Sequence, residues 1–260
     1  MKIPRTHPRF ESLRIRESLV KGVRSGIVVP EGLIAHGRGE AFDYILGERT
    51  LSTARRATRA AAAQLLRAQT PVVSVNGNTA ALVPREIVRL ASLVAAKLEV
   101  NLFHRTRERE VTIARLLRRY GAREVLGVGS KASMRIRGIS SPRVRADPSG
   151  IGRADVVLVP LEDGDRASAL QNLGKTVIAI DLNPLSRTSQ VASVTIVDNV
   201  VRALPALIEQ ARTLRHRPPS EFDKIITDFN NRQNLTSTLV EMTRYLEGWS
   251  RNCWKKIAWS

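Results

Sequence analysis

Three short aliphatic runs, each ending in polar residues, constrain the fold of this chain most. They lie within residues 155–166, 176–188 and 194–199, and acids, amides, Gly or Arg follow each run. Such runs are typical of parallel strands that are buried on both faces, so the polar residues stand at the carboxyl ends of the strands. Open α/β sheets bind their ligands along that edge.

Strand and helix alternate along most of the chain. Further strands are predicted within residues 71–80, 97–103 and 125–129, and helices over residues 12–26, 53–68, 84–96, 108–120 and 200–214. This order predicts a doubly wound, mostly parallel, Rossmann-like sheet with helices on both faces. We assign residues 1–214 to this α/β domain, which begins with a helical arm.

Residues 215–260 are predicted to form a separate helical extension. Residues 216–220 are typical of a linker, and Ser220 is placed to cap a helix that begins at Glu221. This short segment contains Trp249, Trp254 and Trp259. Tryptophan at that density favours packing against the body of the protein or against a second subunit.

Composition limits the function classes. Lys and Arg number 42 against 24 Asp and Glu, a net charge of +18. An Arg-rich surface suits polyanions, either nucleic acid or phosphorylated small molecules, although a compositional bias explains it equally well. Aromatic residues make up only 4%, so few side chains can stack on single-stranded nucleic acid, and nucleic-acid binding is the less favoured interpretation.

Targeting and redox signals are absent from the sequence. The single Cys253 excludes an internal disulfide and a thiolate zinc cluster. The basic, proline-broken start does not resemble a signal peptide, and no apolar run approaches the roughly 20 residues that span a bilayer. We therefore expect a soluble cytoplasmic protein with no membrane segment.

Several polar segments are expected to converge at the ligand edge, because loops after parallel strands share one side of the sheet. Asn76 and Asn78 flank Gly77 at a strand end, where they either form a tight turn or donate to an oxyanion. Residues 36–40 (His-Gly-Arg-Gly-Glu) predict a backbone that approaches a ligand closely, with His36 and Arg38 directed at it. A structural histidine is an equally good interpretation of His36.

Other charged segments allow two interpretations each. Asp43, Glu48 and Arg49 are typical of an ordinary surface charge cluster. Residues 131–150 are rich in Arg, Ser, Pro and Gly without clean periodicity, which indicates either a phosphate clamp or a solvated loop. Neither a GxGxxG fingerprint nor a GxxxxGK[ST] loop is present, which disfavours a dehydrogenase and a P-loop enzyme. The residues alone support an α/β domain that binds an anionic ligand.

Five segments of the chain together resemble one known family. Residues 32–44, 75–78, 159–166, 180–188 and 195–199 resemble the archaeal 4-phosphopantoate:β-alanine ligases, also called phosphopantothenate synthetases. The similarity runs from about residue 3 to residue 211 and is loose in residues 131–150 and in the C-terminal extension. It implies ATP-dependent synthesis of 4′-phosphopantothenate for coenzyme A through an acyl-adenylate, with release of AMP and diphosphate. It also implies a homodimer that needs Mg²⁺.

The resemblance assigns roles to residues at matching positions. The implied ATP contacts are Arg16, Arg38, Asp181, Leu182, Asn183, Arg187, Thr188, Asn199 and Val200. Contacts to 4-phosphopantoate or the adenylate are expected from His36, Asn76, Asn78, Asn101 and Arg105, and the catalytic role from Arg38, His36, Asn76 and Asn78. Glu162, Asp163 and Asp165 are candidates for a metal ion or for the ammonium of β-alanine, or they form a charged loop cap. The metal ligands stay open.

Overall fold

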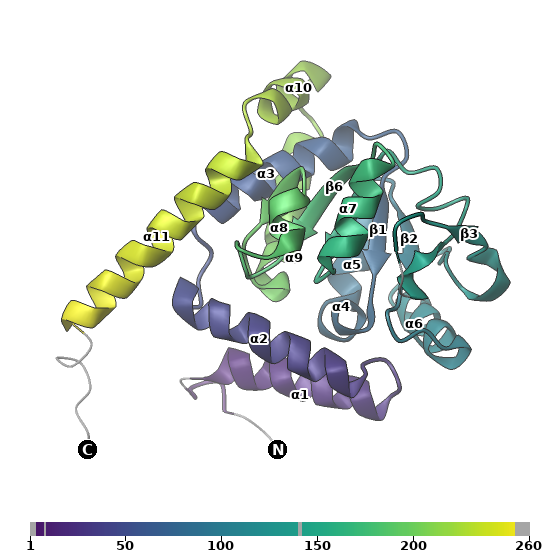
Figure 1. The fold of residues 1–260 in the computed structure, drawn as a ribbon, viewed down its shortest axis with the longest axis horizontal. Helices are drawn as coiled ribbons and strands as arrows, with labels where there is room; N and C mark the ends of the chain where they lie inside the picture. The colour runs from purple at the N-terminus through teal and green to yellow at the C-terminus, as the bar shows by residue number, and fades with distance from the viewer. Residues whose placement is uncertain (1–3, 8, 140–141, 253–260) are drawn as a thin grey trace.

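The computed structural model describes residues 4–7, 9–139 and 142–252. Five parallel strands form one sheet in the order β2-β1-β5-β6-β7 (Figure 1). They are β1 (Val72–Val75), β2 (Lys97–Val100), β5 (Val156–Pro160), β6 (Thr176–Ile180) and β7 (Val194–Ile196). The chain leaves β1 for β2 on one side and later returns to β5 on the other, so a topological switch point lies between β1 and β5. The predicted α/β fold is confirmed.

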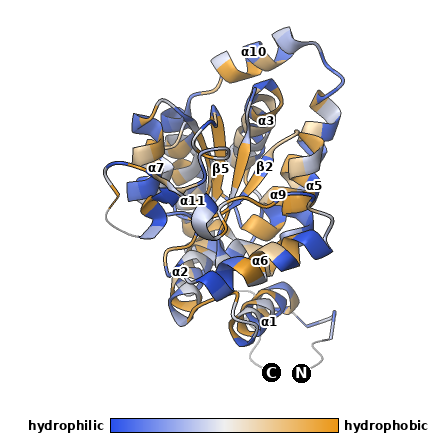
Figure 2. Ribbon diagram, turned by 90° about the vertical axis from the view of Figure 1, so that its right-hand side faces the viewer, coloured by the Kyte–Doolittle hydropathy of each residue, from blue (hydrophilic) through white to orange (hydrophobic). Residues whose placement is uncertain are grey.

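Both faces of the sheet are covered. In β5, Val156 and Leu158 pack into one apolar cluster, whereas Val157 and Val159 pack into another. The larger cluster is covered by α3 (Ser52–Arg67), α5 (Pro84–Leu93), α6 (Arg107–Arg119) and α9 (Val200–Leu214), and the smaller one by α7 (Gly164–Asn172) and α8 (Arg187–Val191). Figure 2 shows the apolar strands between helices whose polar residues lie mainly outside. Burial on both faces explains why the strands are continuously apolar.

Two N-terminal helices, α1 (Phe10–Arg24) and α2 (Pro30–Leu46), lie beside each other below the sheet (Figure 1). Residues 36–40 therefore lie within a helix, and the predicted close approach of their backbone to a ligand stays a prediction. Pro at the start of α2 and Gly47, with φ 77°, at its end favour the helix at its two boundaries. Packing of Phe42, Ile45 and Leu46 into an apolar cluster compensates for the poor helix propensity of its internal glycines.

The C-terminal extension consists of α10 (Pro219–Thr227) and α11 (Asn231–Asn252). Pro218 is the N-cap of α10 and Pro219 is its first residue, a position that prolines favour. The helix therefore begins before the predicted Ser220 cap. Figure 1 shows α11 running past α2 and α3 and beyond the body. Trp249 is 51% exposed, and Trp254 and Trp259 lie outside the described residues. Within the described ranges, no helix is long and apolar enough to cross a bilayer.

The predicted strand at residues 125–129 is wrong. Leu126 forms only an isolated bridge to Glu99, and a short 3-10 helix (Gly129–Lys131) follows. Within the described residues of the segment 131–150, β3 (Met134–Arg135) pairs antiparallel with β4 (Arg145–Ala146), and a short 3-10 helix (Pro142–Val144) directly precedes β4. The buried Glu99 carboxylate holds the end of this segment, because it accepts hydrogen bonds from the backbone N–H groups of Asp147 (3.0 Å) and Ile151 (2.6 Å).

Candidate active site

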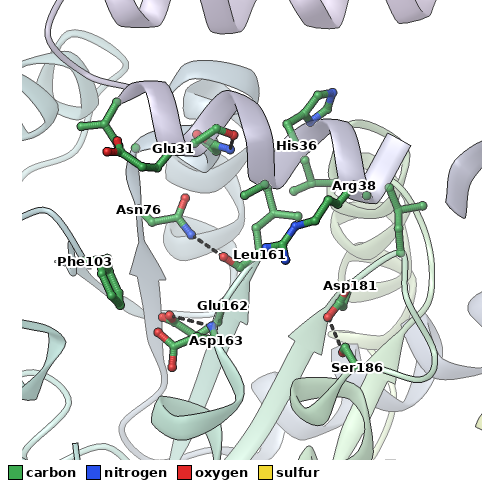
Figure 3. Close-up of a pocket in the computed structure, with 18 of the residues that line it drawn as sticks. Glu31, His36, Arg38, Asn76, Phe103, Leu161, Glu162, Asp163, Asp181 and Ser186 are labelled. Atoms are coloured by element: carbon green, nitrogen blue, oxygen red, sulfur yellow. Dashed lines mark hydrogen bonds between the residues drawn. The ribbon is translucent and has the colours of Figure 1, made fainter. Parts of the chain in front are cut away.

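A pocket of about 700 Å³ lies between α2 and the carboxyl edge of the sheet (Figure 3). Its floor follows β1 and β5, the two strands at the switch point, where open sheets bind ligands. Most of the predicted site residues come together here. Those that line the pocket are His36, Arg38, Asn76, Asn78, Glu162, Asp163, Asp181, Leu182, Asn183, Asn199 and Val200.

Asn76 joins the two strand ends at the switch point. Its Oδ1 accepts hydrogen bonds from the backbone N–H (3.0 Å) and the hydroxyl (2.9 Å) of Thr79. Asn76 is thereby the N-cap of α4 (Gly77–Leu82). Its Nδ2 donates to the carbonyl oxygens of Pro160 (2.9 Å) and Leu161 (3.0 Å). Leu161 has φ 53°, a left-handed conformation that costs energy for a non-glycine residue and that these bonds help to hold. Both N–H groups of Asn76 thus hold the floor in shape.

The roof helix α2 presents His36 and Arg38 in different directions. In Figure 3 the Arg38 side chain is directed towards the floor, whereas the His36 ring is directed away from it. Burial lowers the pKa of His36 although the Glu40 carboxylate opposes this. His36 is therefore neutral near pH 7, and its buried Nε2 has no hydrogen-bond partner among the described residues. Arg38 is exposed and forms no ion pair with a described residue, so its charge is available to an anion.

One end of the pocket is formed by the loops after β6 and β7. The Asp181 carboxylate accepts hydrogen bonds from the Ser186 hydroxyl (2.5 Å) and the Asn183 backbone N–H (3.0 Å). Burial raises the pKa of Asp181 above its ordinary value despite these bonds. Asn199 caps α9, since its Oδ1 accepts from the Val201 N–H (3.2 Å). A carboxylate at the end of a strand in this position suits a ribose hydroxyl.

Asp43 fixes the roof to this end of the pocket. Its carboxylate accepts from Asn199 Nδ2 (2.8 Å) and pairs with the Arg202 guanidinium (2.5 Å). Arg202 also pairs with Asp198 (2.7 Å), which accepts from the Thr50 hydroxyl (2.6 Å). Asp43 is only 5% exposed, so its predicted place in a surface charge cluster is wrong. It faces the core because α2 turns that side of the helix towards the sheet.

The middle of the floor carries an acidic pair. Glu162 and Asp163 follow β5, and both pair with Arg143, which comes from the irregular segment 131–150. Asp163 also caps α7 by accepting from the Arg166 N–H (2.9 Å). The fully buried Arg166 donates to the Arg143 carbonyl oxygen (2.6 Å), and the Arg143 guanidinium lies 5.6 Å from the centre of the Phe103 ring. The Arg-rich segment therefore contributes one arginine to the pocket.

Arg109 is a pocket residue that sequence reasoning did not find. It comes from α6, and its guanidinium donates to the carbonyl oxygens of Ile27 (2.8 Å) and His104. No carboxylate among the described residues lies within ion-pair distance of it. Burial lowers the pKa of Arg109, and the Glu31 carboxylate is the charge that opposes this. An anion in the pocket would therefore meet a partly desolvated cation.

Six predicted residues lie outside the pocket. They are Arg16, Asn101, Arg105, Asp165, Arg187 and Thr188. Arg16 lies on α1, where it pairs with Glu40 of α2 at 3.1 Å. Arg187 pairs with Asp165 at 2.5 Å near the start of α8, where both side chains are exposed.

The other three of these residues have structural contacts. Thr188 is buried and donates its hydroxyl to the Glu162 carbonyl oxygen (2.9 Å). Asn101 is buried and donates to the Glu99 carbonyl oxygen (3.1 Å). Arg105 forms a buried ion pair with Glu110. The contacts implied by the resemblance at all six positions stay predictions.

The described residues contain no preformed cluster of metal ligands. Across the described ranges, no three His, Cys, Asp or Glu side chains come together in a way that could hold a metal ion. In enzymes that act on nucleotides, Mg²⁺ commonly keeps several water molecules and binds substrate phosphates together with one or two carboxylates. The acids nearest the middle of the pocket, Glu162 and Asp163, are paired with Arg143.

Comparison with known proteins gives one consistent result. A family model described as phosphopantothenate/pantothenate synthetase matches residues 53–245. A relative from Thermococcus onnurineus (strain NA1) is 50% identical over an alignment of 260 positions that covers 98% of this chain and 98% of its own. One from Thermococcus kodakarensis is 51% identical over 93% of this chain and 92% of its own. One from Methanosarcina mazei is 49% identical over 94% of this chain and 96% of its own. All three are named 4-phosphopantoate--beta-alanine ligase.

Proposed function

Because this chain belongs to the phosphopantothenate/pantothenate synthetase family, as the resemblance predicts, we propose that it joins 4-phosphopantoate to β-alanine in an ATP-dependent reaction. The product would be 4′-phosphopantothenate, an intermediate in coenzyme A synthesis. The observation that carries the proposal is identity of about half, over nearly the whole chain, with proteins of that name. The pocket supports it, because its size suits large substrates, and Arg38 and Arg109 in its lining form no ion pair with a described residue and so suit anionic groups.

The nucleotide is proposed to bind at the end of the pocket formed by the loops after β6 and β7. Asp181 would accept from a ribose hydroxyl, and Asn183 and Asn199 line the same end. Arg38 is directed from the roof towards the floor, where it would contact the phosphates (Figure 3). Arg187 and Thr188 begin α8, next to the Ser186 that contacts Asp181, and stay predicted ATP contacts.

The reaction is proposed to pass through an acyl-adenylate. The carboxylate of 4-phosphopantoate attacks the α-phosphorus of ATP, and diphosphate leaves. The β-alanine amine then attacks the acyl carbon, and AMP leaves. The protein's part is to position the reactants and to stabilise the charge on the phosphate oxygens. Arg38 is proposed to supply that charge, and Glu162 and Asp163 are proposed to attract the ammonium of β-alanine.

Further properties are proposed from the family resemblance. Mg²⁺ would bind with ATP and neutralise part of the charge on its phosphates. A homodimer and a cytoplasmic location are likewise proposed. His36, with its neutral ring and unpartnered Nε2, is proposed as a polar contact of the acid or the adenylate. Asn76 and Asn78 are also proposed as residues of the acid-binding part of the pocket, where their side chains hold the floor and the roof helix in position.

Product analysis tests the proposal. The protein is incubated with ATP, Mg²⁺, 4-phosphopantoate and β-alanine, and the nucleotide and phosphate products are separated. Equal amounts of AMP, diphosphate and 4′-phosphopantothenate are expected, and omitting β-alanine should leave diphosphate exchange into ATP intact. Release of ADP and phosphate would contradict the acyl-adenylate, and no product at all would contradict the ligase function.

A further inference from the structure

The end of the pocket opposite Asp181 contains an arginine that has no carboxylate partner among the described residues. It is lined by Asn78 after β1, by Phe103 and His104 after β2, and by Arg109 in the first turns of α6. Arg109 has no carboxylate partner among the described residues, whereas Arg143 is paired with two acids. A partly desolvated cation without a counter-ion favours an anionic group at this end.

The backbone holds the Arg109 guanidinium in place. Two of its nitrogens donate to carbonyl oxygens, those of Ile27 and His104, which fixes the plane of the group. Gly77 is needed for this arrangement, because a Cβ there would lie 2.8 Å from Arg109 Nη2 and 2.4 Å from the Ile27 oxygen. A guanidinium has five N–H groups, so others remain available for an acceptor. A fixed planar donor suits a phosphate or a carboxylate.

We propose that Arg109, with His104 beside it, binds the phosphate monoester of the acid substrate and so selects 4-phosphopantoate over unphosphorylated pantoate. This assignment rests on the proposed ligase function. A phosphate monoester carries a charge near −2 at neutral pH and three acceptor oxygens, so it gains far more than a hydroxyl from an unpaired arginine.

The strand order separates this group from the nucleotide phosphates. The Arg109 guanidinium lies beside Gly77, which follows β1, whereas Asp181 follows β6, and two strand spacings lie between β1 and β6. At about 4.8 Å a spacing, the two groups are roughly 10 Å apart. In-line attack places the acid and the leaving diphosphate on opposite sides of the α-phosphorus. With Arg38 directed towards the floor and proposed for the nucleotide phosphates, Arg109 is left for the acid.

One acidic side chain lies at the same end. Glu31 lies in the first turn of α2, and its carboxylate is 3.9 Å from His104 Nε2. It is exposed, so a bound phosphate would be repelled by it to a small degree. Glu31→Gln is therefore expected to tighten the binding of 4-phosphopantoate slightly, which is the opposite sign to a change at Arg109.

Binding calorimetry on the full-length protein tests the assignment with Arg109→Met. The affinity for 4-phosphopantoate should fall roughly 10- to 150-fold, the loss expected for charge-assisted hydrogen bonds. The affinities for pantoate and ATP should change less than about 3-fold. Arg107→Met is the matched control, since Arg107 is an exposed arginine on the same helix outside the pocket, and it should bind 4-phosphopantoate as the wild type does.

Three outcomes would overturn the assignment. One is an Arg109→Met protein that binds 4-phosphopantoate as tightly as wild type. Another is an equal loss of affinity for pantoate and for 4-phosphopantoate together with a lowered melting temperature, because Arg109 would then only stabilise the fold. The third is a loss confined to ATP. Each differs from failure of the ligase function, in which the wild-type protein binds these compounds but forms no AMP.

Discussion

Removing the Asp43 carboxylate should weaken both the fold and nucleotide binding. Asp43 is 5% exposed and pairs with Arg202, whose other partner is Asp198. It also accepts from Asn199, a residue at the nucleotide end of the pocket. In Asp43→Ala, the Arg202 guanidinium loses one of two carboxylates, and the Asn199 amide loses its acceptor.

The expected cost follows from burial. Breaking a buried ion pair by removing one partner costs about 3–5 kcal/mol, and we expect the lower end because Arg202 keeps Asp198. A loss of about 3 kcal/mol lowers the melting temperature by roughly 6–12 °C in a protein of this size. The freed Asn199 amide should weaken ATP binding by about 1 kcal/mol, or roughly 5-fold, as for one lost hydrogen bond.

Scanning calorimetry and ATP titration measure the two effects separately. The control is Asp223→Ala, because Asp223 pairs with Arg67 at 2.9 Å on the surface, where the side chains are 55% and 53% exposed. An exposed pair contributes about 0–1 kcal/mol, so that variant should melt within about 4 °C of wild type and bind ATP normally. If Asp43→Ala melts as the control does, burial does not strengthen this pair, and the reasoning is refuted.

Three further changes test the remaining assignments. Arg38→Ala should abolish diphosphate exchange driven by 4-phosphopantoate while melting close to wild type, since its side chain has no ion pair among the described residues; unchanged exchange would remove Arg38 from the site. Asp181→Asn should weaken ATP far more than 4-phosphopantoate in calorimetry. Burial raises the Asp181 pKa, so wild-type ATP affinity should fall on acidification at a higher pH than an exposed Asp predicts, and this dependence should be missing from the variant. The Asp155 carboxylate is partly buried, which alone would raise its pKa, but hydrogen bonds from the backbone N–H groups of Gln69 (2.6 Å) and Thr70 (3.0 Å) hold the pKa below its ordinary value. Its stabilisation is therefore present above pH about 3.9 and lost as the pH falls through the folded-state pKa, so Asp155→Asn should lower the melting temperature at pH 7 but not in strong acid; a pH-independent difference would contradict this.

The ends of the strands could be predicted from the sequence. Asn76, Glu162, Asp181 and Asn199 each follow a buried apolar run, and parallel strands bring such positions to one edge. This rule needs only the local pattern and the alternation of strand and helix. It therefore located the pocket without any knowledge of which strands are neighbours.

The roof helix could not be predicted from local pattern. Gly37 and Gly39 lower helix propensity, so the local pattern predicted no helix there, but packing of Phe42 and Leu46 outweighs that effect. Asp43 then looked like a surface acid because its partner Arg202 lies 159 residues away in the chain. A contact at that separation cannot be inferred from the residues that flank Asp43 in the chain.

The two additional arginines of the pocket illustrate the same limit. Arg109 and Arg143 are two among many arginines, and nothing in their neighbouring residues distinguishes them. What matters is whether each has a carboxylate beside it. Arg143 has two such partners and Arg109 has none among the described residues, and only the folded arrangement decides this.

Helix α2 connects the two ends of the pocket. Near its start, the Gly32 carbonyl oxygen accepts from Asn78 Nδ2 (2.8 Å), which follows β1. Near its end, Asp43 accepts from Asn199, which follows β7. Eleven residues of helix span about 16 Å, close to the roughly 14 Å of three strand spacings between β1 and β7. A single stiff helix thus bridges both halves with Arg38 between its attachments. A ligand that shifts one attachment must move Arg38 relative to the other half, so ATP and 4-phosphopantoate should alter each other's affinity, and by the same factor in both directions.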